Sequence, residues 1–249
     1  MLELKSLSAG YGRQPVLDRI TVSFEKGRLT SIIGANGCGK STLLKAILGI
    51  LPLSGGEIVV DGRDLRSMSR TEIAQKIAYL AQGKLLPDMT VEQMVLHGRF
   101  PYLSYPRRYR DSDREAAWSA MNAVGISHLA DEPLSRLSGG MRQNAYIAMA
   151  LAQDTDYILL DEPTTYLDIA HQLELVQLLG RLTAEGRGIV AVMHDLPLAF
   201  NFSDTVVALQ NGRIAAHMPP AEMCASSVTQ EIFGVKMKRM DDRKFYYDY

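Results

Sequence analysis

Short runs of aliphatic residues alternate with helical stretches through much of the chain. Residues 158–160 and 189–193 are two of these runs, and both are rich in isoleucine, leucine and valine. Strands that are buried on both faces show such continuous apolar runs, so the alternation indicates parallel strands covered by helices. The pattern therefore predicts an α/β fold with a parallel-sheet core.

The first sixty residues have a different pattern, in which apolar and polar positions alternate as in half-buried strands. The apolar positions are Leu2, Leu4, Leu7, Ile20, Val22, Phe24, Ile58 and Val60, and turn residues separate them at Gly27, Gly55-Gly56 and Asp61-Gly62. This region predicts an N-terminal antiparallel β lobe beside the parallel core.

From about residue 69 to residue 136 the pattern is mostly helical. Helix starts are indicated by capping-box spacings at Ser69 and Glu72, Thr90 and Gln93, and Ser112 and Glu115. We expect one domain with an inserted helical subdomain. The insertion covers about residues 83–153, and the core lobe covers about residues 1–82 and 154–249.

Two turns near the end of the chain predict β-hairpins. Asn211-Gly212 follows the apolar run at residues 206–209, and Asx-Gly pairs favour two-residue hairpin turns. Asp241-Asp242 separates residues 235–240 from residues 245–249, which predicts a second hairpin.

Composition removes several classes of protein. The 249 residues are 47% hydrophobic and 22% charged, which is typical of globular proteins and argues against disorder, collagen and coiled coils. The net charge of −1 gives no general attraction for nucleic acid. The longest apolar run is far short of the about 20 residues of a membrane span, and the start lacks a signal-peptide pattern. Two distant cysteines, Cys38 and Cys224, fit a reducing compartment, so we expect a cytoplasmic protein.

A glycine-rich loop follows the predicted strand at residues 29–33 and opens a predicted helix at residues 42–48. Backbone N–H groups of such a loop surround phosphates, the lysine adds a positive charge, and the following hydroxyl ligates Mg²⁺. A glycine turn with a chance lysine would not explain the strand before it and the helix after it. The predicted nucleotide-binding residues are Gly34, Asn36, Gly37, Cys38, Gly39, Lys40, Ser41 and Thr42.

A second motif narrows the chemistry. Asp161 and Glu162 end the apolar strand at residues 157–160, where one carboxylate can reach a Mg²⁺ shell and the other can face a water in line with the γ phosphate. Alone, the motif would be a strand with a solvated acidic end. Together with the phosphate loop, it favours nucleotide hydrolysis.

A third motif is a Ser-Gly-Gly helix start at Ser138, Gly139 and Gly140. It could be merely a glycine turn that opens a helix, but free N–H groups and the helix dipole at such a start make a second anion site. The three motifs in this order resemble the ATP-binding subunits of ABC transporters, and the resemblance covers nearly the whole chain. In that family, the third motif closes on the γ phosphate held by the phosphate loop of the other subunit.

The resemblance implies roles for four further residues. Tyr11 would stack on adenine, Gln82 would sense Mg²⁺ and link the site to the helical subdomain, and His194 would contact the γ phosphate. Asp168 would contact the other subunit, although a helix N-cap is an equally good interpretation. The remaining histidines, His171 among them, receive no role.

Residues 97–102 and 148–172 are also similar to the subgroup that imports iron-siderophore, haem and cobalamin complexes. This resemblance implies an ATP- and Mg²⁺-dependent ATPase on the cytoplasmic face of the cell membrane. Its partners would be permease subunits, a second copy in a head-to-tail dimer and, indirectly, a substrate-binding protein. A soluble ABC ATPase acting on ribosomes or DNA, a transporter subunit for another cargo, and a small-molecule kinase are the alternatives.

Cys38 stands where serine is usual in this family. Because it lies beside Lys40 at a helix N-terminus, we expect a positive field that favours the thiolate and makes the thiol reactive. Packing in a crowded turn is the alternative.

Overall fold

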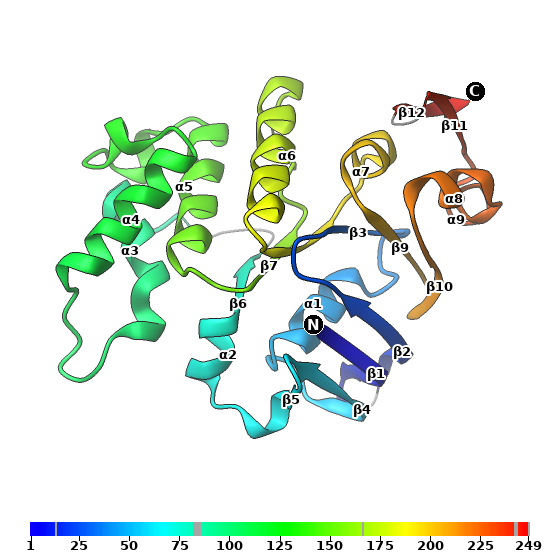
Figure 1. Cartoon of the computed structure of the whole chain (residues 1–249), viewed down its shortest axis with the longest axis horizontal. Coiled ribbons are helices and arrows are strands. Elements are labelled where there is room, and N and C mark those ends of the chain that lie inside the picture. Colours follow the sequence, from blue (N-terminus) through cyan, green and yellow to red (C-terminus); the bar gives the residue numbers. More distant parts are fainter. Residues whose placement is uncertain (13, 82–85, 166, 242–243, 249) are drawn as a thin grey trace.

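The computed structural model describes residues 1–12, 14–81, 86–165, 167–241 and 244–248. Helices of the middle of the chain lie at one end of the molecule, and the sheets, with other helices beside them, make up the rest (Figure 1). The main sheet is six-stranded in the order β10-β9-β3-β8-β7-β6, with β9, β3, β8, β7 and β6 parallel and β10 antiparallel. Its strands are β3 (Leu29–Ile33), β6 (Ile77–Leu80), β7 (Tyr157–Asp161), β8 (Gly188–Val192), β9 (Thr205–Gln210) and β10 (Arg213–Met218). The predicted α/β fold with a parallel core is confirmed.

The predicted antiparallel lobe is also confirmed, as a four-stranded sheet in the order β2-β1-β4-β5. Its strands are β1 (Leu2–Tyr11), β2 (Gln14–Phe24), β4 (Leu53–Val60) and β5 (Arg63–Asp64). Helix α1 (Lys40–Ile47) packs with the apolar face of this lobe and one face of the main sheet, to which Leu159 contributes. Its neighbours Ile158 and Leu160 face the other side, where the remaining large helices pack.

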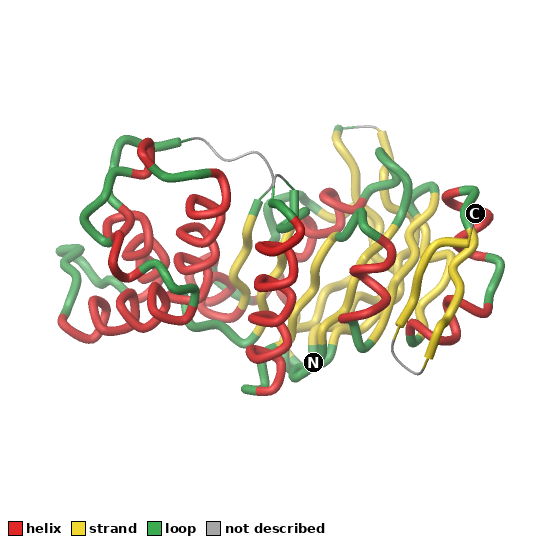
Figure 2. Tube along the Cα trace, turned by 90° about the horizontal axis from the view of Figure 1, so that it is seen from above, coloured by secondary structure: helices red, strands yellow, loops and turns green. Residues whose placement is uncertain are grey.

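The helices between β6 and β7 lie together at one end of the molecule (Figure 2). They are α3 (Val91–Leu96), α4 (Asp111–Ala123) and α5 (Gly139–Ala152), whereas α2 (Arg70–Lys76) lies near β5 and β6; short 3-10 turns occur at Leu65–Ser67, His97–Tyr102, Ser127–Leu129 and Leu134–Arg136. The strand β6 separates α2 from the others and belongs to the main sheet. Within the described ranges, no helix has the length and apolarity that crossing a membrane requires.

Two of the three predicted capping boxes are present. Ser69 and Thr90 each cap a helix and exchange hydrogen bonds with the third helical residue. The third prediction, at Ser112, is wrong because α4 already begins at Asp111. The carboxylate of Asp113 accepts a hydrogen bond from the Arg110 N–H (2.9 Å) and forms an ion pair with Arg99 (3.0 Å). These two contacts fix the start of α4 at Asp111.

The remaining helices cover the main sheet and lead to the end of the chain. They are α6 (Ile169–Ala184), α7 (Leu196–Phe202), α8 (Pro220–Ala225) and α9 (Val228–Phe233), and the last strands are β11 (Lys236–Asp241) and β12 (Lys244–Asp248). Both predicted hairpins form, β9–β10 and β11–β12. The terminal hairpin lies on α7, where Phe200 meets Phe245 edge-on and Asn201 hydrogen-bonds the Phe245 backbone.

A charge network joins the two sheets at the starts of β6 and β7. Lys26 contacts the carboxylates of Asp61 (2.9 Å) and Asp156 (3.1 Å), and Lys76 contacts Asp156 (2.8 Å). Burial raises the pKa of Asp61, but hydrogen bonds from the N-terminal ammonium and Lys26 outweigh it and lower the pKa to about 2. Asp61 is therefore ionised across the physiological range.

Candidate nucleotide-binding site

The predicted site residues of three separate segments meet at one edge of the main sheet. The carboxyl ends of the parallel strands β3, β7 and β8 adjoin there, which is where open α/β sheets bind ligands. A cavity of about 600 Å³ lies at this edge. The predicted residues that line it are Asn36, Gly37, Gly39, Lys40, Ser41, Thr42, Glu162 and His194, and Val16 and Thr165 were not predicted.

The phosphate loop turns back on itself. Lys40 is only 6% exposed, and its ammonium donates to the carbonyl oxygens of Gly34 (2.8 Å) and Ala35 (3.1 Å). Gly34 has φ +157°, and a Cβ there would lie 2.3 Å from the Leu209 carbonyl oxygen, so only glycine fits. The lysine charge is thus held in the loop, within reach of the cavity.

Asp161 and Ser41 form a compact oxygen pair. The Ser41 hydroxyl donates to Asp161 (3.0 Å), and the Tyr79 hydroxyl donates to the other carboxylate oxygen (3.3 Å). Burial raises the pKa of Asp161, against both of these hydrogen bonds. A hydroxyl and a carboxylate suit Mg²⁺, which usually takes one or two protein oxygens and completes its shell with phosphate and water. No group of three or more His, Cys, Asp or Glu suited to a metal occurs in the described ranges.

Glu162 lies directly after Asp161 in an unusual backbone conformation, with φ +53°. Its carboxylate contacts His194 Nε2 (2.5 Å) and accepts a hydrogen bond from the Thr165 hydroxyl (3.3 Å). Residues in sparsely populated backbone regions cluster at functional sites. The sequence did not predict Thr165 or Tyr79, and only their positions could have indicated them. Thr165 follows Glu162 by three residues, and Tyr79 lies on β6, the neighbour of the strand that ends in Asp161.

The Ser-Gly-Gly motif opens α5 and does not line this cavity. Ser138 is the exposed N-cap, and its hydroxyl accepts the Met141 N–H (3.3 Å). Asp168 caps α6 and accepts both the backbone N–H of His171 (2.9 Å) and its ring Nδ1 (2.7 Å). The N-cap interpretation of Asp168 is therefore correct, and His171 also lies next to Gly140, where a Cβ would be 3.4 Å from its ring.

Three predicted residues stand apart from this picture. Tyr11, at the end of β1, is 50% exposed and is not among the lining residues of the cavity. Gln82 lies outside the described residues. Cys38 is only 8% exposed, and burial raises the pKa of its thiol despite the nearby charge of Lys40. The expectation of a thiolate in a positive field is therefore wrong, because desolvation outweighs the charge.

Comparison with known proteins places these motifs in a family. Residues 17–165 match the ABC transporter family model. The chain is 42% identical over 240 residues to the ferric enterobactin transport ATP-binding protein FepC of Escherichia coli (strain K12), covering 96% of this chain and 89% of that protein. It is 42% identical over 246 residues to the petrobactin import ATP-binding protein FpuD of Bacillus anthracis, covering 98% and 90%.

A solved structure shares the fold over almost the full length. It is described as an inward-facing conformation of a putative metal-chelate type ABC transporter, with a TM-score of 0.84 and 26% identity. The match covers 99% of this chain and 95% of the other. The chain therefore belongs to the ABC transporter family, as one of its ATP-binding, ATP-hydrolysing subunits.

Proposed function

We propose that this chain hydrolyses MgATP to power a membrane importer of ferric siderophores or a related metal chelate. The observation that carries the proposal is the meeting of Lys40, Glu162 and His194 at one cavity, in a chain whose relatives import iron chelates. It works on the cytoplasmic face of the cell membrane, as a peripheral subunit.

The phosphate side of the site holds the nucleotide. When the nucleotide binds, the Lys40 ammonium leaves the carbonyl oxygens of its loop and binds the β and γ phosphates, which are stronger acceptors for an ammonium. Ser41 and Asp161 would hold the Mg²⁺, with Gln82 as a further ligand. The metal, when bound, offsets negative charge on the phosphates.

Glu162 is the general base of the reaction. It orients the attacking water, while His194 and Lys40 stabilise the charge that develops on the γ phosphate. The 2.5 Å contact between Glu162 and His194 keeps both side chains at the edge of the cavity before the nucleotide arrives. This arrangement lowers the cost of ordering them during the reaction.

The other half of the site comes from a second copy of the chain. Ser138, Gly139 and Gly140 of one subunit close on the γ phosphate bound by the other, and Asp168 contacts the partner across the same interface. The exposed start of α5, away from its own phosphate cavity, supports this head-to-tail arrangement. Tyr11 stacks on adenine.

The helical subdomain at about residues 83–153 passes this closure to permease subunits, while residues 1–82 and 154–249 form the core lobe. Gln82 would link the two, as the family resemblance implies. The cargo, delivered by a substrate-binding protein, never contacts this chain. Closing and reopening of the dimer drives the permease through its two states.

The experiment has two arms. Crosslinking of a mixed dimer of Lys40→Ala and Ser138→Arg subunits under ATP should join position 40 of one chain to position 138 of the other. Crosslinks only within one chain would contradict the head-to-tail arrangement. Vesicles containing the chain with its co-purified membrane subunits should then take up ferric enterobactin with ATP, and uptake of hemin or cobalamin instead would change the cargo.

A further inference from the structure

The turn of the β9–β10 hairpin touches the phosphate loop although it carries none of the sequence motifs. The Gly212 N–H donates to the Cys38 carbonyl (3.1 Å), and the Gly212 carbonyl accepts the Asp18 N–H (2.9 Å). The two peptide groups that flank Gly212 thus link the phosphate loop to the strand β2: one binds Cys38 and the other binds Asp18.

These segments meet at backbone distance. Gly212 has φ +74°, and a Cβ there would lie 2.0 Å from the Val16 carbonyl oxygen. Neither segment can yield by a rotamer change, because the contacts are between main-chain atoms. Val16 itself lines the phosphate cavity.

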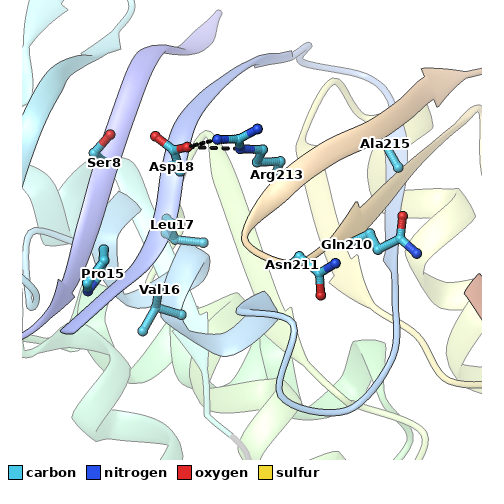
Figure 3. Close-up of a pocket in the computed structure, with 9 residues that line it drawn as sticks. All are labelled: Ser8, Pro15, Val16, Leu17, Asp18, Gln210, Asn211, Arg213 and Ala215. Atoms are coloured by element: carbon cyan, nitrogen blue, oxygen red, sulfur yellow. Dashed lines mark hydrogen bonds and ion pairs between the residues drawn. The ribbon is translucent and has the colours of Figure 1, made fainter.

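An ion pair flanks the same turn. Figure 3 shows Asp18 of β2 and Arg213 of β10 pointing toward each other across the space between the two strands, with Asn211 at the tip of the hairpin. The Arg213 guanidinium donates to Asp18 Oδ2 through Nε (2.9 Å) and a terminal nitrogen. These hydrogen bonds lower the pKa of Asp18, so the pair stays charged at neutral pH.

We propose that Gly212 is a positioning residue for nucleotide binding. The Cys38 carbonyl and the Gly39 N–H belong to one planar trans peptide, so they point in opposite directions. Because Gly212 holds the carbonyl toward the hairpin, the Gly39 N–H is directed away from it, and Gly39 lines the phosphate cavity. The hairpin thereby presets one donor for the phosphates.

The test compares two alanine variants in matching turns. Gly212→Ala places its Cβ against Val16, whereas Gly62→Ala, in the Asp61-Gly62 turn, has a similar φ of +83° and nothing within 4 Å of its Cβ. We expect Gly212→Ala to raise the Kd for MgATP by about tenfold, as loss of one or two hydrogen bonds predicts, and Gly62→Ala to leave it unchanged.

Thermal unfolding without nucleotide separates positioning from stability. If Gly212→Ala lowers the Tm but binds MgATP as tightly as Gly62→Ala does, the inference is wrong. Arg213→Ala provides a variant that leaves the backbone contacts free to form. It should weaken MgATP binding roughly twofold to threefold, as an exposed ion pair predicts, and Arg213→Lys should restore most of the affinity. Equal MgATP affinity of the unmutated protein, Gly212→Ala and Arg213→Ala would also contradict the inference.

The inference rests on nucleotide binding at the phosphate loop, and Lys40→Ala tests that assumption in the same assay. If Lys40→Ala weakens MgATP binding and Gly212→Ala does not, only the role of Gly212 fails. Unchanged binding by Lys40→Ala would overturn both the proposed site and its positioning by the hairpin.

Discussion

Two glycine turns open helices in this chain, and their surroundings differ. The phosphate loop before α1 is tied to other parts of the chain: Lys40 is buried against loop carbonyls, and Gly212 is hydrogen-bonded to Cys38, although Ala35, Asn36 and Gly37 are exposed. The start of α5 is open to solvent, and among the residues that the structure describes the Ser138 hydroxyl hydrogen-bonds only the Met141 N–H of its own helix. The donors of the first turn are ordered by other segments of the same chain, whereas the second turn lies exposed at the surface.

This contrast separates two ways to bind an anion. A loop that is tied to the rest of its chain and holds a fixed lysine binds phosphate in a single chain, because its donors are already ordered. An exposed helix start offers its partial positive charge to whatever is placed against it, and water screens that charge until a second surface covers it. Affinity should therefore depend on the loop, and the rate of turnover on both.

The largest expected effect comes from the chemical step. Glu162→Gln removes the base and keeps the shape of the side chain, so turnover should fall by at least ~10²-fold while MgATP still binds. Phosphate release and equilibrium binding of a fluorescent ATP analogue measure the two quantities. Phosphate release near the unmutated rate would remove Glu162 from the role of base.

The next prediction compares the two turns directly. Lys40→Ala should weaken MgATP binding to the isolated chain by about tenfold to a hundredfold, because it removes a charged donor. Ser138→Arg should leave that affinity within about twofold and stop turnover, since the exposed cap is not needed by the single chain. Equal losses of affinity in both variants would erase the distinction between the turns.

A third prediction concerns the charge network of Lys26, Asp61, Lys76 and Asp156 at the starts of β6 and β7, at the end of the strands opposite to the nucleotide site. The pKa of Asp61 is about 2 in the folded protein, below the ordinary 3.8. Its contribution to the free energy of unfolding, at most about 2 kcal/mol, is complete above pH 4 and is lost as the pH falls toward 2.

Urea unfolding of Asp61→Asn and of the unmutated protein measures this contribution between pH 7 and pH 3. The difference in unfolding free energy should shrink as the pH falls below 4, and MgATP affinity at pH 7 should not change. A difference that stays constant with pH would show that the Asp61 charge is not its source.

The smallest effect is expected at Cys38. Because burial raises the pKa of its thiol, N-ethylmaleimide should modify it more slowly in the folded protein than in urea. Cys38→Ser should change MgATP affinity by less than about twofold, because the side chain packs inside the loop and its carbonyl makes the bond to Gly212. Fast labelling of the folded protein, suppressed by MgATP, would restore the original thiolate prediction.

Local patterns predicted the elements well because they depend on neighbours in sequence. The alternation of Leu2, Leu4 and Leu7, the Asn211-Gly212 turn and the capping boxes at Ser69 and Thr90 all specify structure within a few residues. Most of the predicted phosphate-loop residues, but not Gly34 or Cys38, also line one cavity with Glu162 and His194, since parallel strands bring their carboxyl ends together.

What the sequence did not reveal depends on distant contacts. The bond from Gly212 to Cys38 spans most of the chain, and no spacing rule connects the two positions. The burial of Cys38, which reversed the predicted direction of its pKa shift, comes from packing that charge counting ignores. The start of α4 was misjudged because Arg99, outside that helix, holds Asp113.

The left-handed backbone of Glu162 sets stability against activity. With φ +53°, this residue costs the fold about 1 kcal/mol, and glycine would remove that strain, partly offset by the greater freedom of the unfolded chain. A sequence optimised only for thermostability would therefore drift away from glutamate at this position. Directed evolution of a more heat-resistant variant should hold residue 162 fixed, because the screen would otherwise reward loss of the enzyme.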